Sequence, residues 1–125
     1  QTLTVSDCFL YRGVMLSGIP NHGFWLGYFN ASYTLKVDAT SIFLCRLINH
    51  MDKKKHNIVT ADATQATVCN EKFPFYPNYV ARNRHKFPKV SMKSPWNLSM
   101  NSVKDAWVLR YSSLKTKELR YKQPA

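Results

Sequence analysis

The chain has 125 residues, of which 45% are hydrophobic and 20% charged, a composition that excludes an intrinsically disordered protein and a membrane span. This length suits one domain, residues 1–125, which can bury a core without metal or disulfide staples. The net charge of +11 is uneven, since residues 72–125 carry 12 Lys/Arg against 2 Asp/Glu. A field of one sign favours an anionic partner, such as a nucleic acid, an anionic lipid, a sulfated glycan or an acidic protein.

Residues 6–18 are predicted to form a short helix. Ser6 is a candidate cap at its start, and Gly18 followed by Pro20 ends the pattern. Residues 23–35 are aromatic and interrupted by glycine, so that both helix and strand remain open for them.

A second helix is predicted over residues 38–55. Asp38 can cap its start, and the lysines at its end suit the negative end of a helix dipole. Its apolar residues recur at helical spacing: Leu44, Leu47, Ile48 and Met51. Residues 60–69 are ambiguous.

The longest predicted helix covers residues 95–121. Ser94 is a good N-cap, and Pro95 would occupy the first helical position, where proline is tolerated. Six large apolar residues then fall within one stripe of the helix: Trp96, Met100, Val103, Trp107, Tyr111 and Leu114. A strand reading survives for residues 107–111, whose apolar residues alternate by two.

These elements predict an all-α fold, a small helical bundle with a long C-terminal amphipathic helix and a Pro/aromatic-rich loop at residues 71–90. The alternative is an immunoglobulin-like β-sandwich, which the order of Cys8, Trp25 and Cys69 also permits.

We expect no enzymatic activity and no cofactor. No nucleophile elbow, phosphate-binding glycine loop or His-Glu-x-x-His motif is present, and no two carboxylates lie at a short spacing. Pairing of Cys45 with His50 or His85 has no support in the sequence. The ligand types Cys45, His50, His56 and Cys69 suit zinc, but their spacing matches no familiar structural site, so that no metal is expected.

The preferred disulfide is Cys45–Cys69, whereas a Cys8–Cys69 bond would favour the sandwich. Sequons at Asn30 and Asn97 permit glycosylation. Because the chain opens with Gln1 rather than Met, either a leader was removed or the chain is a fragment, and we expect a mature protein that is secreted or stored in a secretory vesicle.

The predicted binding surface combines cations that attract an anionic partner with aromatic residues that supply contact area. The cations are Arg82, Arg84, Lys86, Lys89, Lys93, Lys115, Lys117, Arg120 and Lys122. The aromatic contact or anchor residues are Phe73, Phe75, Tyr76, Tyr79, Trp96 and Trp107. Core packing is the competing role for these aromatics.

The stretches VMLSGIPNHGFWLGYF and YTLKVDATSIFLCRLINHM resemble the abalone sperm lysin family and its acrosomal sibling proteins. The likeness lies in the turn at residues 17–19, the Thr34–Leu35 pair and a helix with apolar residues 42–44 that closes at Met51. This resemblance implies a small, basic, all-helical protein of the acrosome that binds the egg coat without catalysis or promotes membrane fusion.

The predicted function is therefore a secreted, basic, non-enzymatic protein that binds an anionic glycoprotein or anionic membrane, in gamete recognition or fusion. The first alternative is a viral or immune β-sandwich ectodomain that binds a receptor. The second is a nucleic-acid binder, which the signs of secretion disfavour. The oligomeric state is open.

Overall fold

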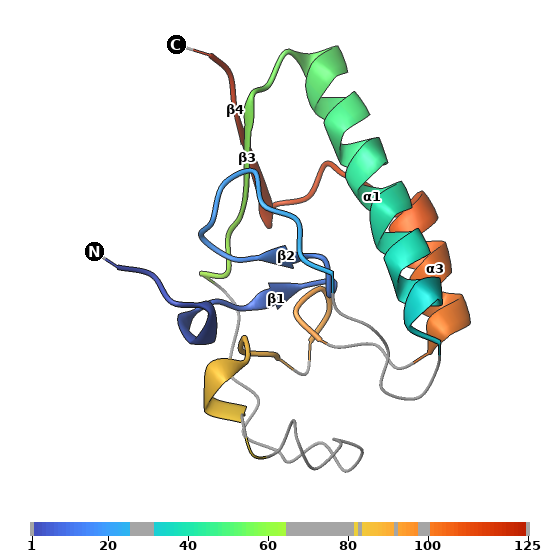
Figure 1. The fold of residues 1–125 in the computed structure, drawn as a ribbon. Coiled ribbons are helices and arrows are strands. Elements are labelled where there is room, and N and C mark those ends of the chain that lie inside the picture. Colours follow the sequence, from blue (N-terminus) through green and yellow to red (C-terminus); the bar gives the residue numbers. More distant parts are fainter. Residues whose placement is uncertain are drawn as a thin grey trace.

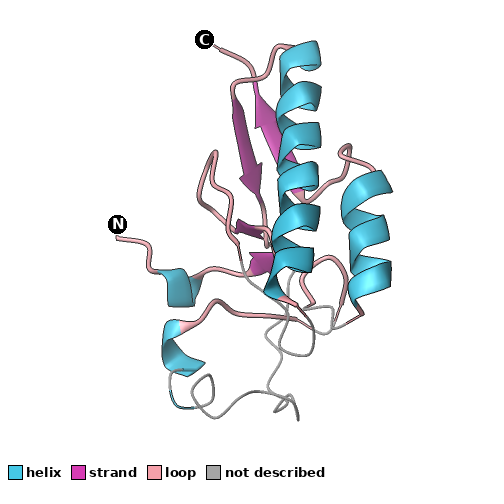
Figure 2. Cartoon of the chain, turned by 45° about the vertical axis from the view of Figure 1, so that its right-hand side comes forward, coloured by secondary structure: helices cyan, strands magenta, loops and turns pink. Residues whose placement is uncertain are grey.

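The computed structural model describes residues 2–25, 32–64, 82, 84–91, 93–97 and 101–124. In chain order these residues form η1 (Val5–Asp7), β1 (Leu10–Tyr11), β2 (Met15–Leu16), α1 (Tyr33–Lys54), β3 (Ile58–Ala61), η2 (Arg84–Lys86), α3 (Ser102–Tyr111) and β4 (Leu119–Lys122). The described part is thus mixed α/β, with two α-helices and two small antiparallel sheets (Figures 1 and 2). The predicted all-α bundle is wrong, and the described strands do not form a β-sandwich either.

A hairpin occupies the segment that was expected to form a helix over residues 6–18. β1 pairs with β2 in antiparallel register, with Leu10 opposite Leu16. Arg12 and Gly13 both have positive φ, at 49° and 71°, and the Val14 amide donates to the Tyr11 carbonyl at 2.9 Å. Such a turn matches the twist of a hairpin. All four strand residues are buried, so the hairpin is covered on both faces, whereas an amphipathic surface helix leaves one face to solvent.

The second sheet joins β3 to the C-terminal strand β4, with Val59 opposite Tyr121. The burial of β3 alternates along the strand, so one face of the sheet turns to the core. Ser17, which follows β2, forms a parallel bridge with Ala61. This bridge fastens the hairpin to β3.

The predicted helix over residues 38–55 is present as α1 and begins earlier, at Tyr33 after the N-cap residue Ser32. At its end Lys55 adopts a left-handed conformation, and the amide of His56 donates to the Met51 carbonyl at 2.9 Å. This arrangement is a Schellman-type end built without glycine.

The predicted helix over residues 95–121 is wrong in extent. α3 begins at Ser102, because the side chain of Asn101 accepts a hydrogen bond from the Lys104 amide at 3.0 Å and caps it there. The helix ends at Tyr111, and β4 follows. At the end of α3 the guanidinium of Arg46, from α1, donates to the Leu109 and Ser112 carbonyls at 2.6 and 2.5 Å.

α1 packs one face on the two sheets and one flank on α3 (Figures 1 and 2). The main core gathers side chains from both sheets, both helices and the turn before α3: Tyr11, Val14, Met15, Ala39, Phe43, Leu47, Val59, Ala61, Trp96, Leu109, Leu114 and Leu119. No helix in the described part of the chain is long and apolar enough to cross a membrane.

Candidate functional site

A cavity of about 420 Å³ opens between the segment of residues 21–25 and the flank of α1 that faces away from α3. Its volume lies within the range of small-molecule and peptide side-chain pockets. Most of its lining is apolar, with polar groups from residues 21, 22, 52 and 56. The lining residues are Met15, Asn21, His22, Gly23, Trp25, Leu44, Leu47, Ile48, Met51, Asp52, His56 and Val59. We call this cavity the α1 groove.

One wall of the α1 groove is fixed to β3 by Asn21. Its backbone amide donates to the Val59 carbonyl at 2.9 Å, and its side-chain oxygen accepts from the Val59 amide at 3.0 Å. Its side-chain nitrogen donates to the Asn57 carbonyl at 2.9 Å. Asn21 has a φ of 51°, in the left-handed region where asparagine is tolerated better than most residues. The asparagine thus holds the wall beside β3 in one geometry.

The opposite wall is α1 itself, which contributes Leu44, Ile48 and Met51 at helical spacing. The two walls approach closely at Gly23, where an added Cβ would lie only 2.7 Å from a methyl carbon of Leu44. Leu47 is 3% exposed, whereas Ile48 is 57% and Trp25 46% exposed. The lining of the groove therefore combines a buried apolar residue with exposed ones from both walls.

Replacing Asn21 with alanine is expected to lower the free energy of unfolding by about 2 kcal/mol, since it removes two hydrogen bonds and places alanine at a positive φ. Asn57→Ala is the matched control and is expected to stay within about 0.5 kcal/mol of the parent, because the Asn57 acceptor is a backbone carbonyl. Urea unfolding followed by circular dichroism measures both values. Equal losses for the two variants would show that Asn21 does not hold this wall.

Two histidine rings meet the Tyr121 ring at the end of the groove near β4. The His56 ring stacks on Tyr121 with centroids 5.2 Å apart, and the His50 ring lies 5.3 Å from it. Burial lowers the pKa of His50, and the nearby ammonium groups of Lys115, Lys54 and Lys53 lower it further. The phenol of Tyr121 donates to the Leu114 carbonyl at 2.6 Å.

Burial, together with Tyr11, raises the pKa of Tyr121 from its ordinary value of 10 to about 12. The folded protein keeps this proton between those pH values while the unfolded chain releases it. The free energy of unfolding should therefore fall as pH rises from about 10 to about 12, and this contribution is fully present below pH 10. Urea unfolding at stepped pH should show a shallower fall for Tyr121→Phe than for the parent. Parallel curves would contradict the assignment.

A buried ion pair joins the two helices at the other end of α1. The Lys36 ammonium lies 2.6 Å from a carboxylate oxygen of Asp105, and the two side chains are 4% and 7% exposed. The same ammonium donates to the Arg12 carbonyl in the hairpin turn at 3.3 Å. Burial lowers the pKa of Lys36, although the carboxylate of Asp105 acts in the opposite direction. The pair links α1, α3 and the hairpin.

The predicted cations fall into two groups that belong to different elements. Arg82, Arg84, Lys86, Lys89 and Lys93 belong to η2 and its neighbourhood, whereas Lys115, Lys117, Arg120 and Lys122 belong to β4 and the loop before it.

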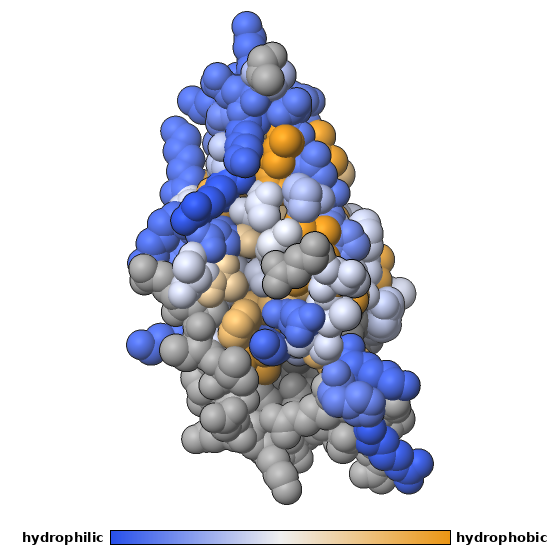
Figure 3. Space-filling view, turned by 90° about the vertical axis from the view of Figure 1, so that its left-hand side faces the viewer, coloured by the Kyte–Doolittle hydropathy of each residue, from blue (hydrophilic) through white to orange (hydrophobic). Residues whose placement is uncertain are grey.

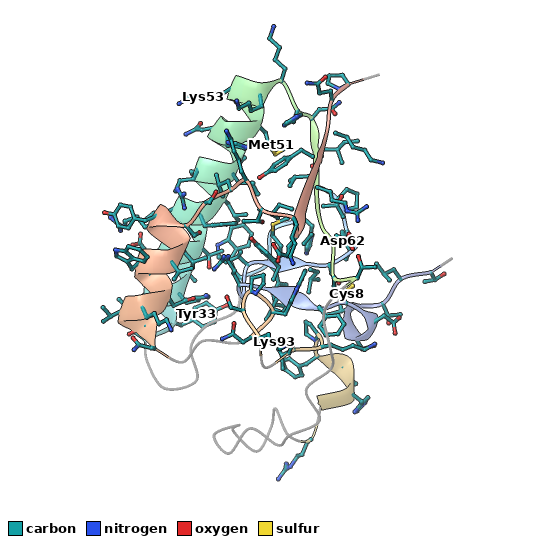
Figure 4. All side chains as sticks on the ribbon, turned by 180° about the vertical axis from the view of Figure 1, so that it is seen from behind. Cys8, Tyr33, Met51, Lys53, Asp62 and Lys93 are labelled. Atoms are coloured by element: carbon teal, nitrogen blue, oxygen red, sulfur yellow. The ribbon has the colours of Figure 1, made fainter. Side chains whose placement is uncertain are left out.

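Lys93 lies toward the Tyr33 end of α1, and Lys53 lies near the other end (Figure 4). The upper part of the face in Figure 3, near the end of α1 and the C-terminus, is predominantly hydrophilic. Arg120 also forms an ion pair with Asp62. The expected anionic partner and secretion stay predictions.

The two predicted aromatic residues that the structure describes differ in burial. Trp96 is 4% exposed and belongs to the core, and Trp107 is 63% exposed on α3. The remaining members, Phe73, Phe75, Tyr76 and Tyr79, lie outside the described residues.

The structure describes only some of the residues in the cysteine and glycosylation predictions. Cys45 is free and exposed on α1, while Cys69 and Asn30 lie outside the described residues. Asn97 is half-buried. Within the described ranges no three His, Cys, Asp or Glu side chains form a group that could hold a metal ion.

The sequence reasoning missed Asn21, Lys36 and Asp105. The pattern Pro20–Asn21 signals a turn, but the partners of Asn21 are 36 and 38 residues further along the chain. Lys36 and Asp105 are separated by 69 residues, and nothing in the local pattern marks either as buried.

The whole chain is similar to curated FAD-containing monooxygenases. It is 38% identical over 127 residues to the FAD-containing monooxygenase EthA of Mycobacterium tuberculosis, an alignment that covers 100% of this chain and 26% of that protein. It is 36% identical over 112 residues to the probable FAD-binding monooxygenase AlmA of Acinetobacter baylyi, covering 88% of this chain and 22% of the relative. A third relative, the putative FAD-containing monooxygenase MymA of M. tuberculosis, is 37% identical over 101 residues. That alignment covers 79% of this chain and 20% of the relative. The chain thus spans about a quarter of the length of the curated relatives it matches.

No family model matches the chain, and no solved structure matches it significantly. The relatives overturn the resemblance to sperm lysin, and with it the expected roles in fertilisation, the acrosome and membrane fusion. They also overturn the expectation of a non-enzymatic binding protein. The quoted stretches misled because they combine the second strand of a β-hairpin with most of a helix, features that unrelated folds share.

Proposed function

We propose that this chain forms about a quarter of an FAD-containing monooxygenase. The observation that carries the proposal is the 38% identity to EthA, which extends over the whole chain rather than over one short motif. The names of the three differently named relatives agree on a flavin and on monooxygenation. The chemistry of such enzymes comes from the flavin, which takes up electrons and reacts with oxygen, while the protein binds and orients it.

The described residues do not fit an FAD site by themselves. Dinucleotides are held by a glycine-rich turn, G-x-G-x-x-G, between a parallel strand and a helix. The four glycines of this chain are spaced too widely for that motif. Both described sheets are antiparallel and two-stranded. We therefore place the dinucleotide-binding turn in the three quarters of the relatives that have no counterpart here, and we derive no catalytic step from this chain.

The part that this chain plays in the proposed enzyme is that of a rigid block beside the flavin-binding part. Its rigidity comes from three links between distant segments: the Lys36–Asp105 pair, the Arg46 contacts to the end of α3 and the Asn21 contacts to β3. A fixed scaffold supports a reaction by holding neighbouring groups in place.

A chimera tests the proposal. In EthA of M. tuberculosis the region that aligns with this chain is replaced by the chain, and the purified protein is assayed for bound FAD and for oxygen consumption with a reduced nicotinamide as electron donor. We expect the chimera to retain FAD and to consume oxygen, whereas the isolated chain mixed with FAD should bind none. Circular dichroism verifies that both proteins fold. A folded chimera that lacks FAD, beside parent EthA that retains it, would contradict the proposal.

A further inference from the structure

The α1 groove exposes apolar surface on a well-defined wall. Ile48 and Trp25 are 57% and 46% exposed beside the buried Leu47. Contiguous exposed apolar surface in a soluble domain marks a site that another molecule covers. Since hydrogen bonds from Asn21 fix one wall and a helix forms the other, the groove is hollowed before anything enters it.

One residue of the groove lining also has a buried polar atom without a partner. The ring nitrogen Nδ1 of His56 is buried and has no hydrogen-bond partner among the described residues. Buried polar atoms are nearly always paired in native proteins. Because this atom has almost no exposed surface, the side chains that a covering molecule meets in the groove are the exposed Ile48 and Trp25.

We propose that the α1 groove is the surface on which this chain packs against the rest of the flavin monooxygenase. This inference rests on the proposed function. The alignment covers 26% of EthA, so nearly three quarters of such an enzyme lie outside this chain and must contact it on some face. The occupant is an apolar segment of that remainder, which covers Ile48 and Trp25.

Other faces fit this occupant less well. A second hollow, of about 320 Å³, lies between α1 and α3, but Asp38 and Arg110 place opposite charges on its walls. On α3, Val103, Trp107 and Tyr111 are also exposed, at 80%, 63% and 62%, but Trp107 and Tyr111 line neither hollow, so that this face lacks the concave, preformed wall of the α1 groove. The end near β4 is rich in exposed lysines, whose charges would lose their hydration under an apolar segment.

The test uses two matched substitutions of exposed aliphatic residues on helices, Ile48→Lys in the groove and Val103→Lys on α3. In the isolated chain both should leave the circular dichroism spectrum and the thermal midpoint unchanged, because both side chains already face solvent. In the EthA chimera, Ile48→Lys should lower the share of molecules that retain FAD at least about tenfold, since the interface would have to bury an unpaired charge. The chimeras with Val103→Lys and with the conservative change Ile48→Leu should both retain as much FAD as the unmodified chimera.

The outcomes separate the two proposals. An unmodified, folded chimera without FAD overturns the proposed function and this inference with it. A chimera that binds FAD and is indifferent to Ile48→Lys overturns the inference alone. Sedimentation of the isolated chain measures whether a second copy covers the groove instead. A stable dimer that Ile48→Lys dissociates would show this and would overturn the inference as well.

Discussion

Replacing Asp105 with alanine is expected to lower the free energy of unfolding by about 3–5 kcal/mol. The substitution leaves the Lys36 ammonium, 4% exposed, without the carboxylate that now lies 2.6 Å away. A buried cation cannot regain its hydration, and burial already lowers the pKa of Lys36 while the carboxylate is in place. Removing one partner therefore lowers the free energy of unfolding by much more than the intact pair contributes to it.

Two comparisons identify the cause of this loss. Asp38→Ala removes an exposed carboxylate from the same end of α1 and should change the free energy of unfolding by no more than about 0.5 kcal/mol. The double variant Lys36→Met, Asp105→Leu replaces both charges with apolar side chains and should recover most of the stability lost by Asp105→Ala. Urea unfolding of the four proteins measures these values. A loss below about 1 kcal/mol for Asp105→Ala would show that the ammonium is not held in a buried site.

The central helix could be predicted because its signals are local. Apolar residues at helical spacing and lysines at its end belong to one continuous segment, and α1 contains nearly all of the predicted range. Its start at Tyr33 was missed because serine and aspartate are about equally good N-caps, and the aromatic, glycine-interrupted residues 23–35 left the helix before Asp38 undecided.

The hairpin and the α1 groove could not be predicted because their determinants are not local. The turn of the hairpin places Arg12 at a positive φ, a conformation that arginine does not signal. The groove wall depends on hydrogen bonds from Asn21 to residues 57 and 59, which lie nearby because the segment after β2 pairs with β3 through Ser17 and Gly18. The net charge of +11 did not predict the function either. Surface charge indicates which molecules a protein attracts, but not which reaction an enzyme catalyses.

Trp96→Ala is expected to lower the free energy of unfolding by about 3–5 kcal/mol, whereas Trp107→Ala should cost less than about 1 kcal/mol. The periodicity of the sequence places both tryptophans on one helical stripe, but their surroundings differ. Trp96 makes edge-to-face contacts with Tyr11 at 5.4 Å and with Phe9 at 6.2 Å, and its backbone carbonyl accepts from the Ser91 amide at 2.8 Å. Removing its ring leaves a cavity between the hairpin and the residues before α3.

Trp107 has no comparable surroundings in the described structure. It is 63% exposed, and its ring contact is with Tyr111 at 5.8 Å on the same helix face. Trp96→Phe serves as the control, since it keeps an aromatic ring in the core and should recover part of the loss. Urea unfolding is followed by circular dichroism, because tryptophan fluorescence changes with the substitutions themselves. Equal losses of unfolding free energy for Trp96→Ala and Trp107→Ala would contradict the burial of Trp96 and the exposure of Trp107. They would instead support the single helical stripe that the sequence predicts.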